Sequence, residues 1–192
     1  MNHSRSALSQ MLDPNNRISI RSSRLPENGR KPIRQKIYEI LVGSVTELCY
    51  GTSLNYFPQN AAILDVGIGN GFMMRRYHEL VKAKALKITG IDISAEALLQ
   101  CARRVKAYGL EDYIELHQAS IEDFHPEVAQ PFDFIFFSMS FMLLEDQGLV
   151  LERVRRMIPA HGEIVFFQTL YAKQLPLMNF IKPRLKYISG VE

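Results

Sequence analysis

The feature that most constrains this chain is a run of closely spaced glycines, Gly67, Gly69 and Gly71. They follow an apolar stretch at 62–66 and precede residues 72–85, whose apolar positions recur at helical spacing. Glycine accepts positive φ and lets a ligand approach the backbone, since no Cβ intervenes. The first N–H groups of a helix also lack partners within it. The pattern therefore predicts a ligand-binding turn between a buried strand and a helix.

Apolar stretches and amphipathic segments alternate along the rest of the chain. The spacing predicts strands at 62–66, 86–91, 113–117, 132–138 and 162–169, and helices at 72–85, 94–108 and 146–158. A further helix is predicted from Pro32 to Tyr50, with Gly51 as its stop. Strands that are apolar throughout indicate an α/β fold, doubly wound, with a mostly parallel sheet and helices on both faces.

The chain divides into a basic tail and one domain. Residues 1–31 lack sustained periodicity and predict a disordered tail, which leaves 32–192 as the domain. Residues 1–36 carry eight Lys and Arg against two acids, whereas the whole chain has a net charge of +3. A mildly acidic body argues against nucleic acid as a partner. We expect a cytoplasmic location; the Ser- and Arg-rich start leaves a mitochondrial one as the alternative.

An acidic residue follows the second predicted strand. Asp92 lies 21 residues after Gly71, and a doubly wound sheet brings it beside the glycine turn. A carboxylate there can accept hydrogen bonds from the hydroxyls of a ribose. The spacing Gly-x-Gly-x-Gly differs from the dinucleotide pattern, because Phe72 stands where its third glycine would be. Asp65 adds a carboxylate that suits an amino group and would repel a pyrophosphate, which favours S-adenosylmethionine over NAD.

These segments resemble the class I S-adenosylmethionine-dependent methyltransferases. Residues 63–72 resemble their first motif, 88–94 their second strand, 118–124 the loop beside the adenine, and 132–144 the acceptor side. The resemblance implies a Rossmann-like fold, S-adenosylmethionine as cofactor and S-adenosylhomocysteine as product. The residues it places at the cofactor are Asp65, Gly67, Ile68, Gly69, Asn70, Gly71, Asp92, Ile93, Ser120, Ile121, Ser138 and Met139.

Within this resemblance, each part of the cofactor has its own residues. The glycines make room for the methionine portion, with Asp65 nearby. Asp92 binds the ribose, Ile93 packs on the adenine, and Ser120 and Ile121 meet its edge. Ser138 and Met139 lie near the sulfonium and the acceptor. The family often has Asp where Ser120 stands, and a hydroxyl is the weaker acceptor.

The acceptor side identifies no catalytic residue. An Asn-Pro-Pro-Tyr motif, a pair of glutamates and a cysteine nucleophile are all missing after the fourth predicted strand, and Glu145 and Asp146 are adjacent, so no metal is implied. We therefore expect a small-molecule acceptor. A catalytically silent module that binds the cofactor and acts as an assembly partner is the alternative. A nucleotide-dependent oxidoreductase is a weaker one, since no Tyr-x-x-x-Lys pair occurs.

The end of the chain is short for this family. A helix at 173–185 and the start of a strand at Tyr187 predict that the closing antiparallel strands are incomplete. The β-prone stretch 163–167 would then lie at an edge and could pair with a second copy to give a homodimer. Lysines among apolar residues in 173–186 leave peripheral membrane contact open. The longest uncharged apolar stretch has eleven residues, too short to span a bilayer.

Overall fold

The computed structural model describes residues 47–127 and 131–168. The predictions for the basic tail, for the helix from Pro32 before residue 47, and for 173–192 lie outside these residues. The described elements are β1 (Ala62–Val66), α3 (Met74–Ala83), β2 (Lys87–Asp92), α4 (Ala95–Ala107), β3 (Ile114–Gln118), β4 (Phe134–Ser138), the 3-10 helix η1 (Phe141–Leu143), α5 (Gln147–Arg155) and β5 (Glu163–Phe167). An unlabelled helix spans 47–56.

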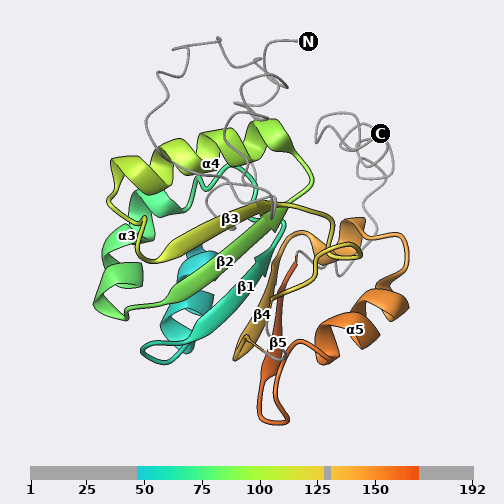
Figure 1. The fold of residues 1–192 in the computed structure, drawn as a ribbon. Coiled ribbons are helices and arrows are strands. Elements are labelled where there is room, and N and C mark those ends of the chain that lie inside the picture. Colours follow the sequence, from blue (N-terminus) through green and yellow to red (C-terminus); the bar gives the residue numbers. More distant parts are fainter. Residues whose placement is uncertain (1–46, 128–130, 169–192) are drawn as a thin grey trace, which may run out of the picture.

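The five strands form one parallel sheet in the order β3-β2-β1-β4-β5, as Figure 1 shows. The chain builds outward from β1 to β3 and then returns to place β4 on the other side of β1. Asp65 of β1 is in register with Gly90 of β2 and Phe136 of β4. This reversal is a topological switch point, where ligands of open α/β sheets bind beyond the carboxyl ends of the strands.

Alternate residues of β1 face two separate apolar clusters. Ile63 belongs to a cluster with residues of the helix 47–56, α3 and α4. Leu64 belongs to a second cluster with residues of α5 and the connection 119–133. Figure 1 shows α5 beside β4 and β5, away from α3 and α4. The predicted Rossmann-like α/β fold, with helices on both faces of a parallel sheet, is confirmed.

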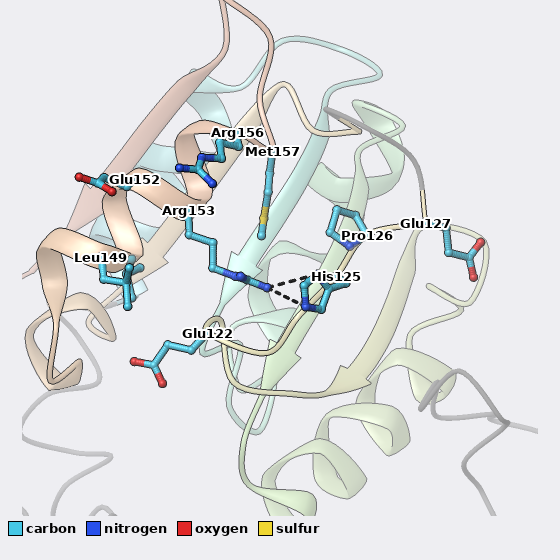
Figure 2. Close-up of a pocket in the computed structure, with 10 residues that line it drawn as sticks. Glu122, His125, Pro126, Glu127, Leu149, Glu152, Arg153, Arg156 and Met157 are labelled. Atoms are coloured by element: carbon cyan, nitrogen blue, oxygen red, sulfur yellow. Dashed lines mark hydrogen bonds between the residues drawn. The ribbon is translucent and has the colours of Figure 1, made fainter.

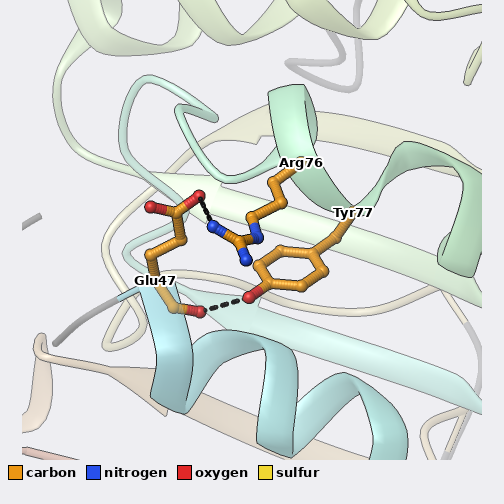
Figure 3. A network of polar contacts seen from close by, with 3 residues as sticks. All are labelled: Glu47, Arg76 and Tyr77. Carbon is orange, nitrogen blue, oxygen red and sulfur yellow. Dashed lines mark hydrogen bonds and ion pairs between the residues drawn. The ribbon is translucent and has the colours of Figure 1, made fainter. Parts of the chain in front are cut away.

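The stop predicted at Gly51 is wrong, because the helix continues to residue 56. Gly51 lies against the ring of Tyr77, where a Cβ would collide. The Tyr77 hydroxyl donates to the Glu47 carbonyl at 2.7 Å, and Arg76 pairs with the Glu47 carboxylate at 3.2 Å (Figure 3). Gly51 is therefore required for the close packing of this helix on α3.

The helix 47–56 ends against a lysine side chain. Lys84 Nζ donates to the carbonyls of Leu54, Asn55 and Phe57 at 2.9, 2.6 and 2.5 Å. A cation at a helix C-terminus satisfies carbonyls that have no partner within the helix. The cap predicted at Ser94 is confirmed, since its hydroxyl accepts from the Ala97 N–H at 3.2 Å.

β5 is one of the two edge strands described, with β3 at the other edge, and it is the most exposed of the five. Residues 169–192 follow it and lie outside the described part of the chain. The incomplete closing strands and the homodimer through β5 therefore stay predictions. Within the described ranges, no helix is long and apolar enough to cross a membrane.

Candidate cofactor-binding site

The three glycines of the turn all adopt positive φ, of +78°, +62° and +66°. Two of them are also required by packing. A Cβ on Gly67 would meet Ser140, and a Cβ on Gly71 would meet the sulfur of Cys101, each at 2.6 Å. A Cβ on Gly69 would instead project into open space, with only the Gly67 carbonyl oxygen, at 3.9 Å, within 4 Å of it in the described structure. Gly69 is thus the position where a ligand can approach the backbone.

Backbone hydrogen bonds tie the turn to the end of β2. The N–H groups of Gly67 and Ile68 both donate to the Ile91 carbonyl, at 2.8 and 3.1 Å. The Gly69 N–H donates to Asp92 Oδ2 at 2.8 Å. The predicted proximity of Asp92 to the glycine turn is therefore present as a direct contact.

Asp92 accepts hydrogen bonds through both carboxylate oxygens. Oδ1 accepts from the Ser94 N–H at 2.8 Å, in addition to the Gly69 contact at Oδ2. Burial raises the pKa of this carboxyl, and the two backbone hydrogen bonds oppose that shift. Each oxygen of a carboxylate has about two lone-pair sites. Asp92 is thus held in one orientation and can still accept from hydroxyl groups of a ligand.

Asp65 is the one buried charged residue of the described chain, at 1% exposure. The Tyr50 hydroxyl donates to Oδ2 at 3.0 Å, and Oδ1 has no hydrogen-bond partner among the described residues. Burial raises the pKa of Asp65 to about 7; the Tyr50 hydrogen bond lowers it, and the Asp92 charge raises it. A buried polar atom without a partner is costly and is typical of positions that a ligand or an ion uses.

Ile68 and Asn70, the other two turn residues predicted at the cofactor, make contacts within the protein that stabilise the turn. The Ile68 side chain packs over Gly90, where a Cβ would collide with it. Asn70 Oδ1 accepts from the Phe72 N–H at 2.9 Å, and the Asn70 carbonyl accepts from Arg104. The Ile68 side chain is partly buried and packs against the first cluster.

Residues predicted beside the adenine differ in exposure. Ile93 is 60% exposed and free to pack against a flat ring. Ser120 Oγ contacts the backbone N–H and the carboxylate of Glu122, at 3.2 and 3.3 Å. Ile121 is only 2% exposed and packs in the second cluster. A contact between the Ile121 side chain and the adenine does not fit this burial, so only its backbone can meet the ring edge.

At the carboxyl end of β4, Ser138 and Met139 stand next to the end of β1. Met139 has a φ of +62°, which is uncommon for a non-glycine residue, and its N–H donates to the Phe167 carbonyl at 2.7 Å. Ser140, which the sequence did not single out, donates through Oγ to the Val66 carbonyl. The loop after β4 is thereby fastened to the strand that leads into the glycine turn.

Apolar side chains follow this fastening point. Met142 and Leu143 of η1 are 42% and 50% exposed, and Phe166 of β5 is 41% exposed. The Phe166 ring stacks on Phe137, with centroids 5.4 Å apart, and meets Phe141 edge-on at 4.7 Å. An exposed apolar rim of this kind suits contact with an apolar group.

A cleft of about 500 Å³ lies elsewhere, between α5 and residues 122–127 (Figure 2). Its lining includes Glu122, Glu152, Leu149 and Met157. Arg153 donates to the carbonyls of Ile121 and Phe124, at 2.9 and 2.8 Å, and contacts the His125 ring, and so joins α5 to the loop after β3. None of the predicted site residues lines this cleft. In the described residues, no group of His, Cys, Asp or Glu could hold a metal ion.

Taken together, the residues at the switch point fit an S-adenosylmethionine molecule. The open backbone at Gly69 leaves room for the ligand, and the unpaired oxygen of Asp65 suits a cationic amino group nearby. Asp92 offers oriented acceptors for ribose hydroxyls, and Ile93 an exposed apolar surface for a base.

Comparison with known proteins identifies a methyltransferase family, in agreement with the resemblance seen in the sequence. The model of the methyltransferase domain family matches residues 63–162, more than half of the chain. The chain belongs to this family. The predicted class I methyltransferase family, its S-adenosylmethionine dependence and its enzyme class are thereby confirmed.

Individual relatives of the methyltransferase are distant. It is 27% identical over 147 residues to a phosphatidylethanolamine N-methyltransferase of Cereibacter sphaeroides, covering 75% of this chain and 68% of the relative. It is 32% identical over 102 residues to the uncharacterized methyltransferase YdaC of Bacillus subtilis, covering 53% and 52%. Among solved structures, a putative S-adenosyl-L-methionine-dependent methyltransferase of Methanococcus maripaludis shares the fold, with a TM-score of 0.60 at 18% identity, covering 86% of this chain and 78% of that one.

Proposed function

We propose that this methyltransferase holds S-adenosylmethionine at the turn 67–71 and transfers its methyl group to a small molecule that enters over the carboxyl end of β4. The observation that carries the proposal is the Gly69–Asp92 contact at the switch point, beside a backbone position that is open to a ligand. When bound, the cofactor would supply a methyl group activated by a positively charged sulfur, so that the acceptor would bond to the methyl carbon as the carbon–sulfur bond breaks, with S-adenosylhomocysteine as the leaving group.

The residues of the chain then bind the cofactor and orient it toward the acceptor. Asp92 fixes the ribose, and Asp65 attracts the amino group of the methionine portion. Ile93 covers one face of the adenine, and the backbone of Ser120 and Ile121 meets its edge. Ser138 and Met139 limit the space beside the reacting methyl group. Holding two reactants in line accounts for a large part of such a rate enhancement without a covalent intermediate.

The acceptor has an apolar portion, in our proposal, because the exposed side chains of Met142, Leu143 and Phe166 lie near the carboxyl end of β4. A distant relative is named for methylation of phosphatidylethanolamine, a lipid with an amine head group. An acceptor that combines a nucleophilic amine with an alkyl chain fits both observations. The amine would lie at the carboxyl end of β4, and the chain would lie along this rim.

Two measurements test the proposal. Calorimetric titration with S-adenosylhomocysteine should give saturable binding, and NADH should give none; the reverse result would exclude the methyltransferase. Transfer of labelled methyl groups should then be measured for pairs of amines that share a head group and differ only in the alkyl chain. Higher kcat/KM for the alkylated member supports the acceptor class, whereas equal values contradict it. Cofactor binding without any transfer would favour the silent module.

A further inference from the structure

Tyr50 connects the helix 47–56 to the carboxylate that precedes the glycine turn. Its side chain is 5% exposed, and its hydroxyl donates to Asp65 Oδ2 at 3.0 Å. Its ring packs against Phe136 of β4, with centroids 5.4 Å apart, and against Tyr77 of α3 at 6.3 Å. Packing on both neighbours leaves the ring little rotational freedom, so the hydroxyl fixes the orientation of the carboxylate.

The second oxygen of the Asp65 carboxylate, Oδ1, is shielded from solvent and has no hydrogen-bond partner among the described residues. The ionised form is therefore poorly stabilised in the free protein. A cation placed near the turn would stabilise it even without direct contact, because charges interact strongly over several ångströms in a low-dielectric environment.

We propose that Tyr50 is a positioning residue, which holds Asp65 so that its unpaired oxygen attracts the α-ammonium group of the cofactor's methionine portion. This inference rests on the proposed binding of S-adenosylmethionine at the turn. It assigns to the helix 47–56 a part in cofactor recognition, through a hydroxyl that itself stays away from the ligand.

The other polar neighbours of Asp65 do not replace Tyr50. Burial raises the pKa of the Cys101 thiol of α4 to about 12, so this thiol is neutral. Asp92 at the end of β2 raises the pKa of Asp65 through its charge. Arg104 of α4 donates to the Asn70 carbonyl, and the Tyr77 hydroxyl of α3 donates to the Glu47 carbonyl. Tyr50 is the neighbour whose hydrogen bond lowers the pKa of Asp65.

The first test separates the methionine portion from the rest of the cofactor. S-adenosylhomocysteine carries the amino acid portion, whereas 5′-methylthioadenosine has the same nucleoside and sulfur without it. Calorimetry at pH 7 should show that Tyr50→Phe weakens binding of the first by about tenfold, the size of one hydrogen bond to a charged group, and leaves the second unchanged. Tyr77→Phe is the matched control, since it removes a hydroxyl from the same ring cluster without touching Asp65; both affinities should stay as in the wild type.

The second test uses pH. Affinity of the wild type for S-adenosylhomocysteine should rise between pH 5.5 and 7.5 as Asp65 ionises, since burial places its pKa at about 7. Tyr50→Phe should move this rise to higher pH. Asp92 also has a raised pKa and would bind the ribose of both ligands, so the quantity to compare is the ratio of the affinities for S-adenosylhomocysteine and 5′-methylthioadenosine. This ratio should rise with pH in the wild type and stay constant in Asp65→Asn.

Failure of the proposed function and failure of this inference give different results. If the wild type binds neither ligand, both are overturned. If it binds both but Tyr50→Phe weakens them equally, or not at all, only the role of Tyr50 is overturned. Should Tyr50→Phe be less stable, both ligands are titrated at a temperature where it is folded, and an unchanged ratio of the two affinities contradicts the inference.

Discussion

The two halves of the sheet end in opposite kinds of surface. Beyond β1 and β2, polar groups meet in defined hydrogen bonds, such as those that Asp92 accepts from Gly69 and Ser94. Beyond β4, the apolar side chains of Met142 and Leu143 are exposed, as is that of Phe166 near the end of β5. The helices do not follow this division, because the helix 47–56, α3 and α4 pack on one face of the sheet and α5 packs on the other.

This difference fits two different tasks. Hydrogen bonds are directional, so a turn that is held by them suits a single ligand of fixed shape. Apolar contact is non-directional and tolerates acceptors of varied shape. We expect substitutions at the β1–β2 end to change stability and cofactor affinity strongly, and substitutions at the β4–β5 end to change mainly acceptor preference.

The largest effect is expected from the buried charge. Because the pKa of Asp65 is about 7 when folded against 3.8 as its ordinary value, the folded state retains a proton that the unfolded state releases. The free energy of unfolding should therefore fall as pH rises from about 4 to about 7, by at most about 1.4 kcal/mol per pH unit. Asp92, whose pKa is also raised, contributes with the same sign.

Urea denaturation of the wild type and of Asp65→Asn at pH 5 and pH 8 measures this contribution. The loss of stability between these two pH values should be smaller in the variant. An equal loss in both proteins would mean that Asp65 is ionised throughout, contrary to its burial.

Next comes the turn itself, where Gly71→Ala and Gly69→Ala form a matched pair. Both residues have positive φ, which costs an alanine about 1–2 kcal/mol. Only the Gly71 variant also forces a Cβ against Cys101, so it should lose about 1–3 kcal/mol more than the other. Equal losses in thermal unfolding would contradict the packing role of Gly71. Gly69→Val should remove cofactor binding more completely than it lowers stability.

Asp92→Ala should have a smaller effect. It should weaken cofactor binding by about 1.5–3 kcal/mol, which is the range for losing charge-assisted hydrogen bonds. The Gly69 and Ser94 N–H groups would lose their acceptor at the same time, so stability should fall as well. Calorimetry with S-adenosylhomocysteine at a temperature where the variant is folded measures the affinity. An unchanged value would remove Asp92 from the site.

The smallest effect should come from the apolar rim. Met142→Ser combined with Leu143→Ser should change the free energy of unfolding by about 0.5 kcal/mol or less, because both side chains are exposed. Cofactor affinity should also stay the same, while kcat/KM for alkylated acceptors falls severalfold. A large loss of cofactor affinity would show that the two halves of the site are not separate.

Sequence signals located the elements and the turn because these depend on local patterns. Apolar stretches gave the five strands, and the glycines and Asp92 were correctly placed together by the topology of a parallel sheet. Local patterns do not give side-chain direction. The sequence therefore could not show that the Ile121 side chain is buried in the second cluster, or that the Ile68 side chain packs over Gly90. Gly51 was misread as a helix stop because a glycine needed for packing looks the same in a sequence.

The contacts of Tyr50 and Ser140 could not be predicted from the sequence, for a related reason. Each makes its decisive contact with a residue far along the chain, Tyr50 with Asp65 and Ser140 with the Val66 carbonyl. Such pairs depend on how a helix or a loop docks on the sheet, and one sequence contains no record of that docking. The acidic residue at 65 was a partial signal, since a buried carboxylate requires a donor nearby.

The strand order also bears on the route by which the chain folds. β2 pairs with β1 and β3, its neighbours in the sequence, whereas β4 pairs with β1, from which β2 and β3 separate it in the sequence. The Ala62 N–H, for example, donates to Asp133 Oδ2, 71 residues further along the chain. Closing a longer loop costs more entropy, so contacts of this kind form later. We expect pulsed hydrogen-exchange labelling during refolding to protect β1 to β3 before β4 and β5. Asp92 would then meet the glycine turn while the carboxyl end of β4 is still unformed, and we expect cofactor present during refolding to bind this part of the sheet.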